Sequence, residues 1–327
     1  MNNYTIVAFC GGGIRGLLSA TVLQNLAVSY PQILTGTNLF AGTSTGADIV
    51  SMLVGDTPKT PAEIVAYYLG PVVKFYRDPS TNPSAPAYSV DKAYLGAWSV
   101  HDGNQPLSSF LPQNILMTAF SVGSSANQPW NTMLFSNIIG PMLQDAGIAD
   151  AATASSAMPG MLGSWTGNLG GAFVDGGFVN HDPTLAAIAA AVQSGVALES
   201  ISAITIGTGY MPNWIASDTK TWGAQQWQNG DGNPNNNTPA LLINGTISPV
   251  LNASLNGTST NLIPQLAGML LGNRYANINP QIPFIAENDV SQAALNELVS
   301  AAQNANLCAA ETILANYWPS SPRLPHA

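Results

Sequence analysis

Apolar and polar positions near the start of the chain change from one periodicity to another. Residues 4–10, YTIVAFC, form a continuous apolar run, which is typical of a strand buried on both faces. After a glycine-rich loop, Ile14, Leu18, Val22 and Leu26 recur at helical spacing. The opening of the chain therefore predicts a strand, a loop and a helix.

The order of strand, loop and helix is repeated in the next part of the chain. A short strand is expected over 38–41 and a helix over 47–55, and this βαβα order predicts a mostly parallel sheet under helices. The pattern also predicts later strands over 115–122, 132–136, 171–180 with a glycine turn inside, and 202–209. The strand over 202–209 is expected to close the sheet.

Capping signals mark several helices. Thr60, Pro61 and Glu63 form a capping box with proline at the first helical position, which predicts a helix toward Leu69. Asp182 is expected to be an N-cap. Further helices are expected over 148–157, 183–194, 291–304 and 309–317.

No charged or Pro/Ser-rich linker divides the chain, so a single domain over residues 1–327 is expected. Irregular or helical segments near 58–114 and 212–285 are expected to cover the sheet, and within the first of them residues 76–114, which are rich in Pro, Ser, Asn and Tyr, are expected to be irregular. Residues 229–239, NGDGNPNNNTP, form a patch of low complexity.

The composition limits the possible partners. Charged residues make up only 8% of the chain, against about 25% in ordinary soluble domains, and the net charge is -9 with eight Lys and Arg. Nucleic acid and electrostatic recruitment to anionic membranes both need clustered cations, which this sequence lacks. Contact with a lipid surface would therefore be mainly apolar.

The chain gives no sign of export or membrane insertion. Residues 1–9 lack the features of a cleavable signal, and no apolar stretch reaches the ~20 residues needed to span a bilayer. Cys10 and Cys308 are too few for a disulfide framework. The expected compartment is the cytoplasm, with export by a route without a cleavable signal left open.

The loop CGGGIRG is compatible with two functions, dinucleotide binding and stabilisation of an oxyanion. Gly11, Gly13 and Gly16 satisfy the dinucleotide-binding pattern, but that pattern also needs an acidic residue about 20 positions further on. The second predicted strand ends without one, and the first acid is Asp48. The loop is therefore interpreted as a source of backbone N–H groups for a developing oxyanion.

A nucleophile candidate follows the second predicted strand. Gly42-Thr43-Ser44-Thr45-Gly46 has the G-x-S-x-G pattern of a nucleophile elbow between a strand and a helix. Gly42 and Gly46 flank Ser44 because the sharp turn leaves no room for larger side chains. The N-terminus of the following helix directs its N–H groups and dipole toward the serine.

An elbow serine needs a base. The histidines are His101, His181 and His326, of which His181 is the candidate for a triad, while surface positions are expected for the other two. Asp175, in FVDGGFV, is the stronger candidate, although in isolation an Asp-Gly turn of a hairpin would be the better explanation of this segment. The occurrence of a glycine loop, an elbow and an acid together in one βα chain favours the interpretation of Asp175 as the base.

These three motifs, in this order, resemble those of patatin-like phospholipases. The family pattern G-G-G-x-[KR]-G, G-x-S-x-G and D-G-G/A corresponds here to 11–16, 42–46 and 175–177. Weaker similarities lie at 154–160, 204–209 and 275–281, so the resemblance covers most of the chain. It implies a three-layer αβα sandwich and an acyl hydrolase for lipid esters.

The resemblance also implies roles for individual residues. Ser44 would be the nucleophile and Asp175 the general base, with a pKa raised by burial. The oxyanion hole would be formed by Gly11, Gly12 and Gly13. Arg15 would brace the loop or meet a phosphate, and the remaining supporting residues would be the elbow glycines together with Gly176 and Gly177. The chain departs from the family at His181 and Asp182, where Asn-Asn is usual.

Several alternatives stay open. A catalytically silent lipid-binding or effector-like module could keep the fold, and an acyltransferase could use the same dyad. Neutral or zwitterionic lipid at a membrane or micelle surface is the expected substrate, with acyl chains lined by segments such as 130–135 and 262–272. No cofactor or metal is expected, and calcium dependence is not implied, because no D-x-[DN]-x-[DN]-G loop occurs. Whether an activator is needed, and the oligomeric state, are left undetermined.

Overall fold

A computed structural model describes residues 3–55, 57–100, 103–139, 145–238 and 248–319. Its centre is a seven-stranded sheet in the order β4-β3-β2-β1-β6-β7, with β5 paired to β3. The strands are β1 (Tyr4–Phe9), β2 (Leu39–Thr43), β3 (Asn114–Ser121), β4 (Asn131–Ser136), β5 (Phe173–Asp175), β6 (Ile201–Ile206) and β7 (Tyr275–Ile278).

The sheet is mostly parallel, as predicted. Strands β3, β2, β1, β6 and β7 run parallel to one another, and only β4 and β5 pair with β3 in the antiparallel sense. Side chains of β1 alternate between two cores: Val7 and Phe9 belong to one, Ile6 and Ala8 to the other. Both faces of the strand are thus buried, which is why its sequence is continuously apolar.

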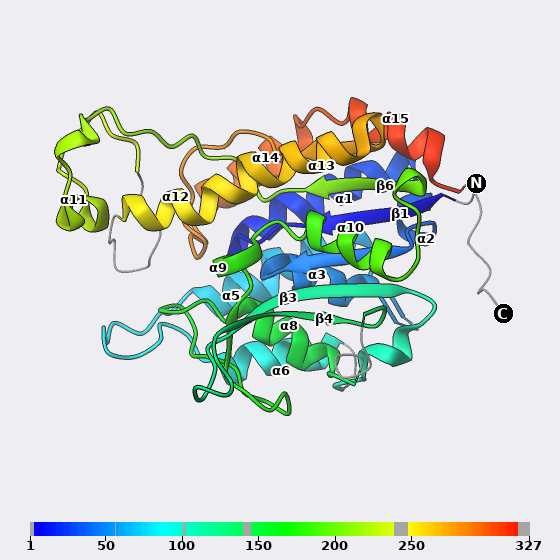
Figure 1. Cartoon of the computed structure of the whole chain (residues 1–327), viewed down its shortest axis with the longest axis horizontal. Coiled ribbons are helices and arrows are strands. Elements are labelled where there is room, and N and C mark those ends of the chain that lie inside the picture. Colours follow the sequence, from blue (N-terminus) through cyan, green and yellow to red (C-terminus); the bar gives the residue numbers. More distant parts are fainter. Residues whose placement is uncertain (1–2, 56, 101–102, 140–144, 239–247, 320–327) are drawn as a thin grey trace.

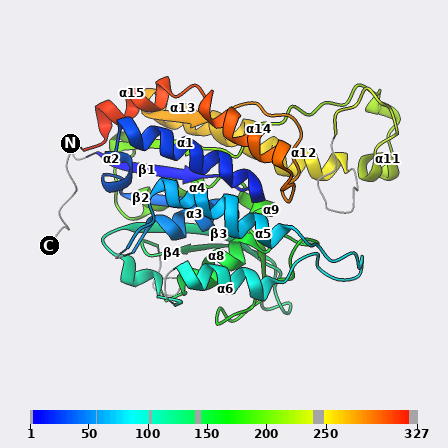
Figure 2. The ribbon, with the colours of Figure 1, turned by 180° about the vertical axis from the view of Figure 1, so that it is seen from behind.

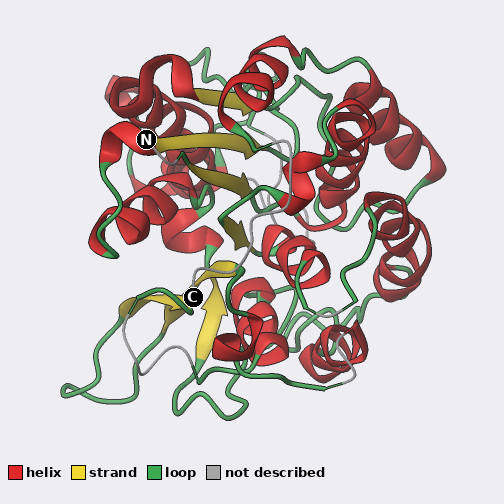
Figure 3. Ribbon diagram, turned by 90° about the vertical axis from the view of Figure 1, so that its right-hand side faces the viewer, coloured by secondary structure: helices red, strands yellow, loops and turns green. Residues whose placement is uncertain are grey.

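Helices cover both faces of the sheet. One face carries α10 (Thr184–Gln193) and α13 (Ile263–Leu271) (Figure 1), and the other carries α1 (Gly16–Ser29), α3 (Thr45–Leu53) and α8 (Ile148–Ser156) (Figure 2). Seen from the side in Figure 3, the twisted sheet lies between helices. The molecule is a three-layer αβα sandwich, as the resemblance implied.

The other helices extend this frame. They are α2 (Gln32–Thr35), α4 (Pro61–Tyr67), α5 (Val73–Tyr76), α6 (Val90–Val100), α9 (Gly177–Asn180), α11 (Ala224–Asn229), α12 (Pro249–Gly257), α14 (Gln292–Gln303) and α15 (Cys308–Tyr317). The predicted capping box begins α4: Glu63 N donates to Thr60 Oγ1 at 3.3 Å, and Thr60 N donates to Glu63 Oε2 at 2.8 Å.

Three predictions about secondary structure are wrong. The sheet does not end at β6, because β7 pairs with it from inside the expected covering segment 212–285. After β5 the chain turns into the short helix α9, although 171–180 was expected to continue as a strand. Segment 76–114 contains the helix α6. Short strands and one-turn helices carry too few periods to be recognised before their partners are known.

Candidate active site

The turn between β2 and α3 holds Ser44 in a strained conformation. Its φ is 55° and its ψ -127°, and it is the one non-glycine residue with positive φ in the described chain. A Cβ on Gly42 would lie 2.3 Å from Gly46 O, and one on Gly46 would lie 2.2 Å from Phe9 O. Only glycine fits at both positions, so the elbow depends on them.

The sheet register brings Asp175 to this turn. The last residue of β2, Thr43, pairs with Thr118 of β3, and the next residue of β3, Ala119, pairs with Asp175 of β5. Strand β4 occupies the opposite edge of β3 along these residues. Asp175 therefore lies beside β3 at the position directly beyond the end of β2, where the chain turns at Ser44.

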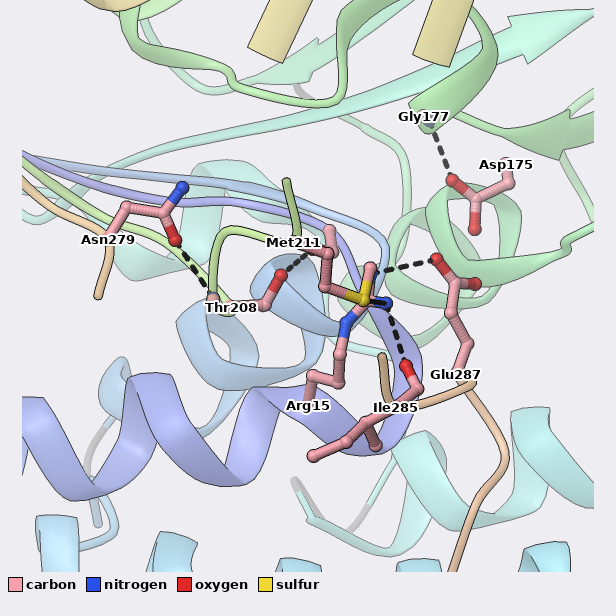
Figure 4. A network of polar contacts seen from close by, with 10 residues as sticks. Arg15, Asp175, Gly177, Thr208, Met211, Asn279, Ile285 and Glu287 are labelled. Atoms are coloured by element: carbon pink, nitrogen blue, oxygen red, sulfur yellow. Dashed lines mark hydrogen bonds and ion pairs between the residues drawn. The ribbon is translucent and has the colours of Figure 1, made fainter. Parts of the chain in front are cut away.

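Ser44 and Asp175 lie close together and are buried. The Ser44 hydroxyl is near enough to the Asp175 carboxyl to lower its pKa, and Gly177 N donates to Asp175 Oδ1 at 2.7 Å (Figure 4). On the other side of the turn, Ser44 N donates to Ser155 Oγ at 2.8 Å. The two residues are only 8% and 3% exposed, so the pair is held largely away from bulk water.

Burial also changes the acidity of the pair. It raises the pKa of Asp175 from 3.8 to about 7, and the hydrogen bonds from Ser44 and Gly177 oppose this rise. The carboxyl groups of Glu287 and Asp48 contribute smaller parts of this rise. A carboxylate with this pKa is a much stronger base than a solvated one, and it still ionises near neutral pH.

The glycine loop lies against the elbow. A Cβ on Gly11 would lie 3.2 Å from Ser44 Cβ, and Gly12 and Gly13 have positive φ of 148° and 58°. Gly11 N donates to His181 O at 3.1 Å, which differs from the expectation that Gly11 is an oxyanion donor, since its N–H is already engaged. Within the described chain, the N–H groups of Gly12 and Gly13 have no acceptor.

Arg15 braces this loop. The residue is buried, with Nη1 donating to Ile285 O at 3.1 Å and Nη2 lying 3.4 Å from Glu287 Oε1 (Figure 4). Glu287 also accepts a hydrogen bond from Ile14 N at its carbonyl, at 2.8 Å. Of the two expected roles for Arg15, these contacts support the bracing of the loop by segment 285–287.

The imidazole of His181 packs behind the site. It would lie 3.1 Å from a Cβ on Gly11 and 3.2 Å from one on Gly177. Burial, together with a smaller effect of the Arg15 charge, lowers its pKa to about 4, so the ring is neutral at physiological pH. Its Nδ1 finds no partner in the described chain. His101 and His326 lie outside the described residues.

A cavity of about 410 Å³ opens at Ser44. Apolar side chains from α6, from α5 and the helical turn before it, and from the segment after α8 line it, among them Val72, Phe75, Ala97, Met158 and Leu162. The expectation that 130–135 and 262–272 line the acyl site is wrong for this cavity. Those segments belong mainly to β4 and to α13, which packs on the opposite face of the sheet.

Two acids at the cavity escaped the sequence reasoning. Asp48 lies on α3 one turn after Ser44, so helical spacing alone could have indicated it. Burial raises the pKa of Asp48 to about 7, and Ser156 Oγ donates to its Oδ1 at 3.3 Å. Glu287 comes from an irregular segment far along the chain and carries no local motif. Both acids act electrostatically on Asp175.

The described residues contain neither a metal-binding cluster nor a membrane-spanning helix. No cluster of His, Cys, Asp or Glu there could hold a metal ion. Among the helices that the structure describes, none combines the length and apolarity required to cross a bilayer.

Comparison with known proteins assigns the chain to a family. Residues 7–188, more than half of the chain, match the patatin-like phospholipase family. The chain is 26% identical to protein teg of Priestia megaterium over 334 residues, which cover 97% of this chain and all of teg. It is also 26% identical to CotR of Bacillus subtilis over 333 residues, covering 98% of this chain and all of CotR.

Among solved structures, VipD from Legionella pneumophila is similar with a TM-score of 0.37 and 14% identity, over 63% of this chain and 50% of that one. Because the family match covers more than half of the chain, the chain belongs to the patatin-like phospholipase family, as its motifs implied. Membership of this family supports lipid hydrolysis as the general class of activity.

Proposed function

We propose that the chain is a lipid acyl hydrolase of phospholipase A type, with Ser44 as nucleophile and Asp175 as general base. The observation that carries the proposal is the buried pairing of these two residues, in which the Ser44 hydroxyl is close enough to the Asp175 carboxyl to lower its pKa, beside a 410 Å³ cavity that Ser44 lines. The cavity would hold the acyl chain of a lipid at a membrane or micelle surface.

The first half of the reaction forms an acyl-enzyme. Asp175 accepts the proton of the Ser44 hydroxyl while Oγ attacks the ester carbonyl. The negative charge that develops on the carbonyl oxygen is stabilised by the N–H groups of Gly12 and Gly13. The C–O bond to the glycerol oxygen then breaks, and Asp175 returns its proton to the leaving alcohol.

The second half releases the fatty acid. Water enters after the alcohol has left, Asp175 accepts a proton from it, and the hydroxyl attacks the acyl carbon. The bond to Ser44 Oγ breaks and the proton passes back to that oxygen, which restores the starting state. Loss of one oxyanion donor in comparable sites costs about 10²–10³ in rate, so the glycine loop would contribute a large part of the catalysis.

Paired substitutions test the assignment. Ser44→Ala and Asp175→Asn should each abolish fatty-acid release from a neutral glycerolipid, while Asp91→Asn, at an exposed position on α6, should leave it unchanged. Far-ultraviolet circular dichroism would establish that each variant is folded. Retained activity in either folded dyad variant would remove the proposed dyad.

The alternatives are separated by two further measurements. A fluorophosphonate probe should label Ser44 if the serine is activated, and a silent lipid-binding module would stay unlabelled. Products formed in the presence of an added alcohol should be free fatty acid if water is the acceptor. A predominant ester product would instead indicate an acyltransferase.

A further inference from the structure

A second cavity lies away from the dyad. It measures about 480 Å³ and is enclosed by the segment 210–219, helix α11 and the helix that begins with α12. In Figure 1, α11 and α12 extend from the sandwich beyond the sheet. Helix α12 contacts α9, the short helix that directly follows Asp175 and Gly176, so the second cavity is at the catalytic end of the molecule.

The lining of this cavity combines aromatic rings with uncharged hydrogen-bonding groups. Its main side chains are Tyr210, Trp214, Trp227, Asn213, Asn252 and Asn261, joined by serine and threonine hydroxyls. No lysine, arginine, histidine, aspartate or glutamate is among its described lining residues.

The uncharged, partly aromatic lining limits the classes of ligand that this cavity can bind. A phosphorylated or carboxylated ligand would find no cation to pair with, although such groups are normally bound by Arg or Lys. An acyl chain carries no hydrogen-bonding group, so it would use only the rings and the aliphatic part of this lining. A sugar ring fits both features, because its C–H face can pack on an aromatic ring while its hydroxyls meet the amides.

Trp214 is exposed yet fixed in place. The residue is 54% exposed, but its Nε1 donates to Asn235 O at 2.8 Å. Its backbone exchanges hydrogen bonds with Asn237, at 3.1 and 2.9 Å. A ring held this way loses little conformational freedom when a ligand packs on it, which favours binding.

The asparagine-rich tract provides this support. Asn236 Oδ1 accepts hydrogen bonds from Ala216 N at 2.7 Å and Ser217 N at 3.2 Å, and Asn233 Nδ2 donates to Ser217 Oγ at 2.8 Å. The low-complexity patch of the sequence therefore organises the wall that carries Trp214. Trp222, which precedes α11, packs edge-on against Trp227 of α11, with ring centroids 5.2 Å apart.

We propose that this second cavity binds a neutral sugar, with the ring packed against Trp214 or Trp227 and its hydroxyls bonded to the asparagine side chains. The sugar could be part of a free oligosaccharide or the head group of a neutral glycolipid, since both present the same groups. Binding there does not require the Ser44–Asp175 chemistry, so this proposal and the proposed hydrolysis can fail independently.

The experiment uses the full chain and two kinds of probe. Neutral oligosaccharides of glucose, galactose and N-acetylglucosamine are titrated by isothermal calorimetry. Vesicles of phosphatidylcholine, with and without a neutral glycosyldiacylglycerol, are tested by co-sedimentation in the Ser44→Ala background, so that hydrolysis does not remove the probe. Binding in the first arm indicates free sugar, and binding in the second arm alone indicates the head group.

Variants locate the binding. At least one of Trp214→Ala and Trp227→Ala should weaken association by about tenfold or more, while phenylalanine at that position should retain most of it. Trp130→Ala is the matched control, because Trp130 is 75% exposed and lies outside the cavity lining. The far-ultraviolet circular dichroism of each variant should match that of the wild type, which verifies folding without relying on the proposed hydrolysis.

The proposal is overturned if none of these neutral sugars binds saturably in either arm. It is also overturned if folded Trp214→Ala and Trp227→Ala both bind as tightly as the wild type, or if Trp130→Ala weakens binding equally. Preferential binding of vesicles with an anionic lipid in place of the glycolipid would likewise contradict a neutral ligand.

Discussion

The acidity of one buried carboxyl, Asp175, determines how the proposed enzyme should respond to pH. The base must be ionised to accept the Ser44 proton, and its pKa is about 7. We therefore expect kcat/KM to rise with pH through about 7 and to level off above it. A pH profile with a soluble ester substrate measures this. A profile that is already flat from pH 5 upward would contradict a base with a raised pKa.

Asp48 should influence that profile from a distance. Its carboxyl is among the causes that raise the pKa of Asp175, and its own pKa is also about 7, so the two titrations are coupled. Asp48→Asn removes the negative charge, and the midpoint of the kcat/KM profile should move to lower pH. The exposed Asp91→Asn is the control and should leave the midpoint in place. An upward shift in Asp48→Asn would contradict the electrostatic coupling.

The same burial should cost stability. Because the pKa of Asp175 rises from 3.8 to about 7 on folding, the folded state prefers the protonated acid, and stability is lost as pH rises between these values. Asp175→Asn removes this penalty. We expect its free energy of unfolding to exceed that of the wild type by on the order of 2 kcal/mol at pH 8, with little difference at pH 4. Urea titrations at both pH values measure this. A variant that is less stable than the wild type at pH 8 would contradict it.

At the residue level, the sequence indicated some of the site and missed the rest for a physical reason. Ser44 and Asp175 stand in short motifs, because a strained turn and an Asp-Gly step restrict the residues around them. Glu287 has no such local restriction. Its position beside Arg15 results from long-range folding of segment 285–287 onto the glycine loop, and nothing near it in the chain indicates this contact.

At the element level, the strand–turn–helix unit of the elbow is the most constrained part of the fold. Gly46→Ala would place a Cβ 2.2 Å from the backbone oxygen of Phe9, so β1 and α3 would have to separate. We expect a loss of roughly 3 kcal/mol or more, or failure to fold. Gly70→Ala is the matched control, because nothing lies within 4 Å of its added Cβ. It should be neutral or stabilising by up to about 1 kcal/mol. Thermal denaturation of both variants tests this, and equal melting temperatures would contradict the packing argument.

Helix α6 forms a wall of the proposed acyl cavity, and enlarging one of its side chains should shorten the chains that fit. Ala93 lines the cavity and is half-buried. Ala93→Phe should lower kcat/KM for long-chain esters more than for short-chain esters, because added volume competes with the distal acyl carbons. Ala186→Phe, on α10 across the sheet, is the control. An equal loss for all chain lengths would contradict this position of the acyl chain.

Strands and helices with a long hydrophobic pattern or a capping motif were predictable from the sequence. Strands and helices without such local signals were not. Strand β1 is buried on both faces, and α4 begins with a capping box, so both have local signals. Strand β7 has four residues at the edge of the sheet, and its assignment depends on pairing with β6. Helix α6 was hidden in a segment rich in Pro, Ser and Asn, although its Ala97 packs into the main core.

For the whole molecule, we propose that residues 1–327 form one domain. The main core cluster joins residues from β1, such as Val7, with Trp318 just after α15. Trp318 is only 4% exposed, and its Nε1 donates to Thr37 Oγ1 at 2.9 Å. The two ends of the chain therefore share one core, and the covering helices α4 and α6 pack into it as well.

A single core predicts a single cooperative unfolding transition. Scanning calorimetry should show one transition with equal calorimetric and van't Hoff enthalpies. Trp318→Ala removes a large buried side chain and should cost about 3–5 kcal/mol. If the core is shared, the whole transition moves to lower temperature without splitting, because the N-terminal strands lose the same contacts as α15. Trp130→Ala, at an exposed position, should leave the curve in place. Two separate transitions, with only one displaced by Trp318→Ala, would instead mean that the C-terminal helices fold as an independent unit.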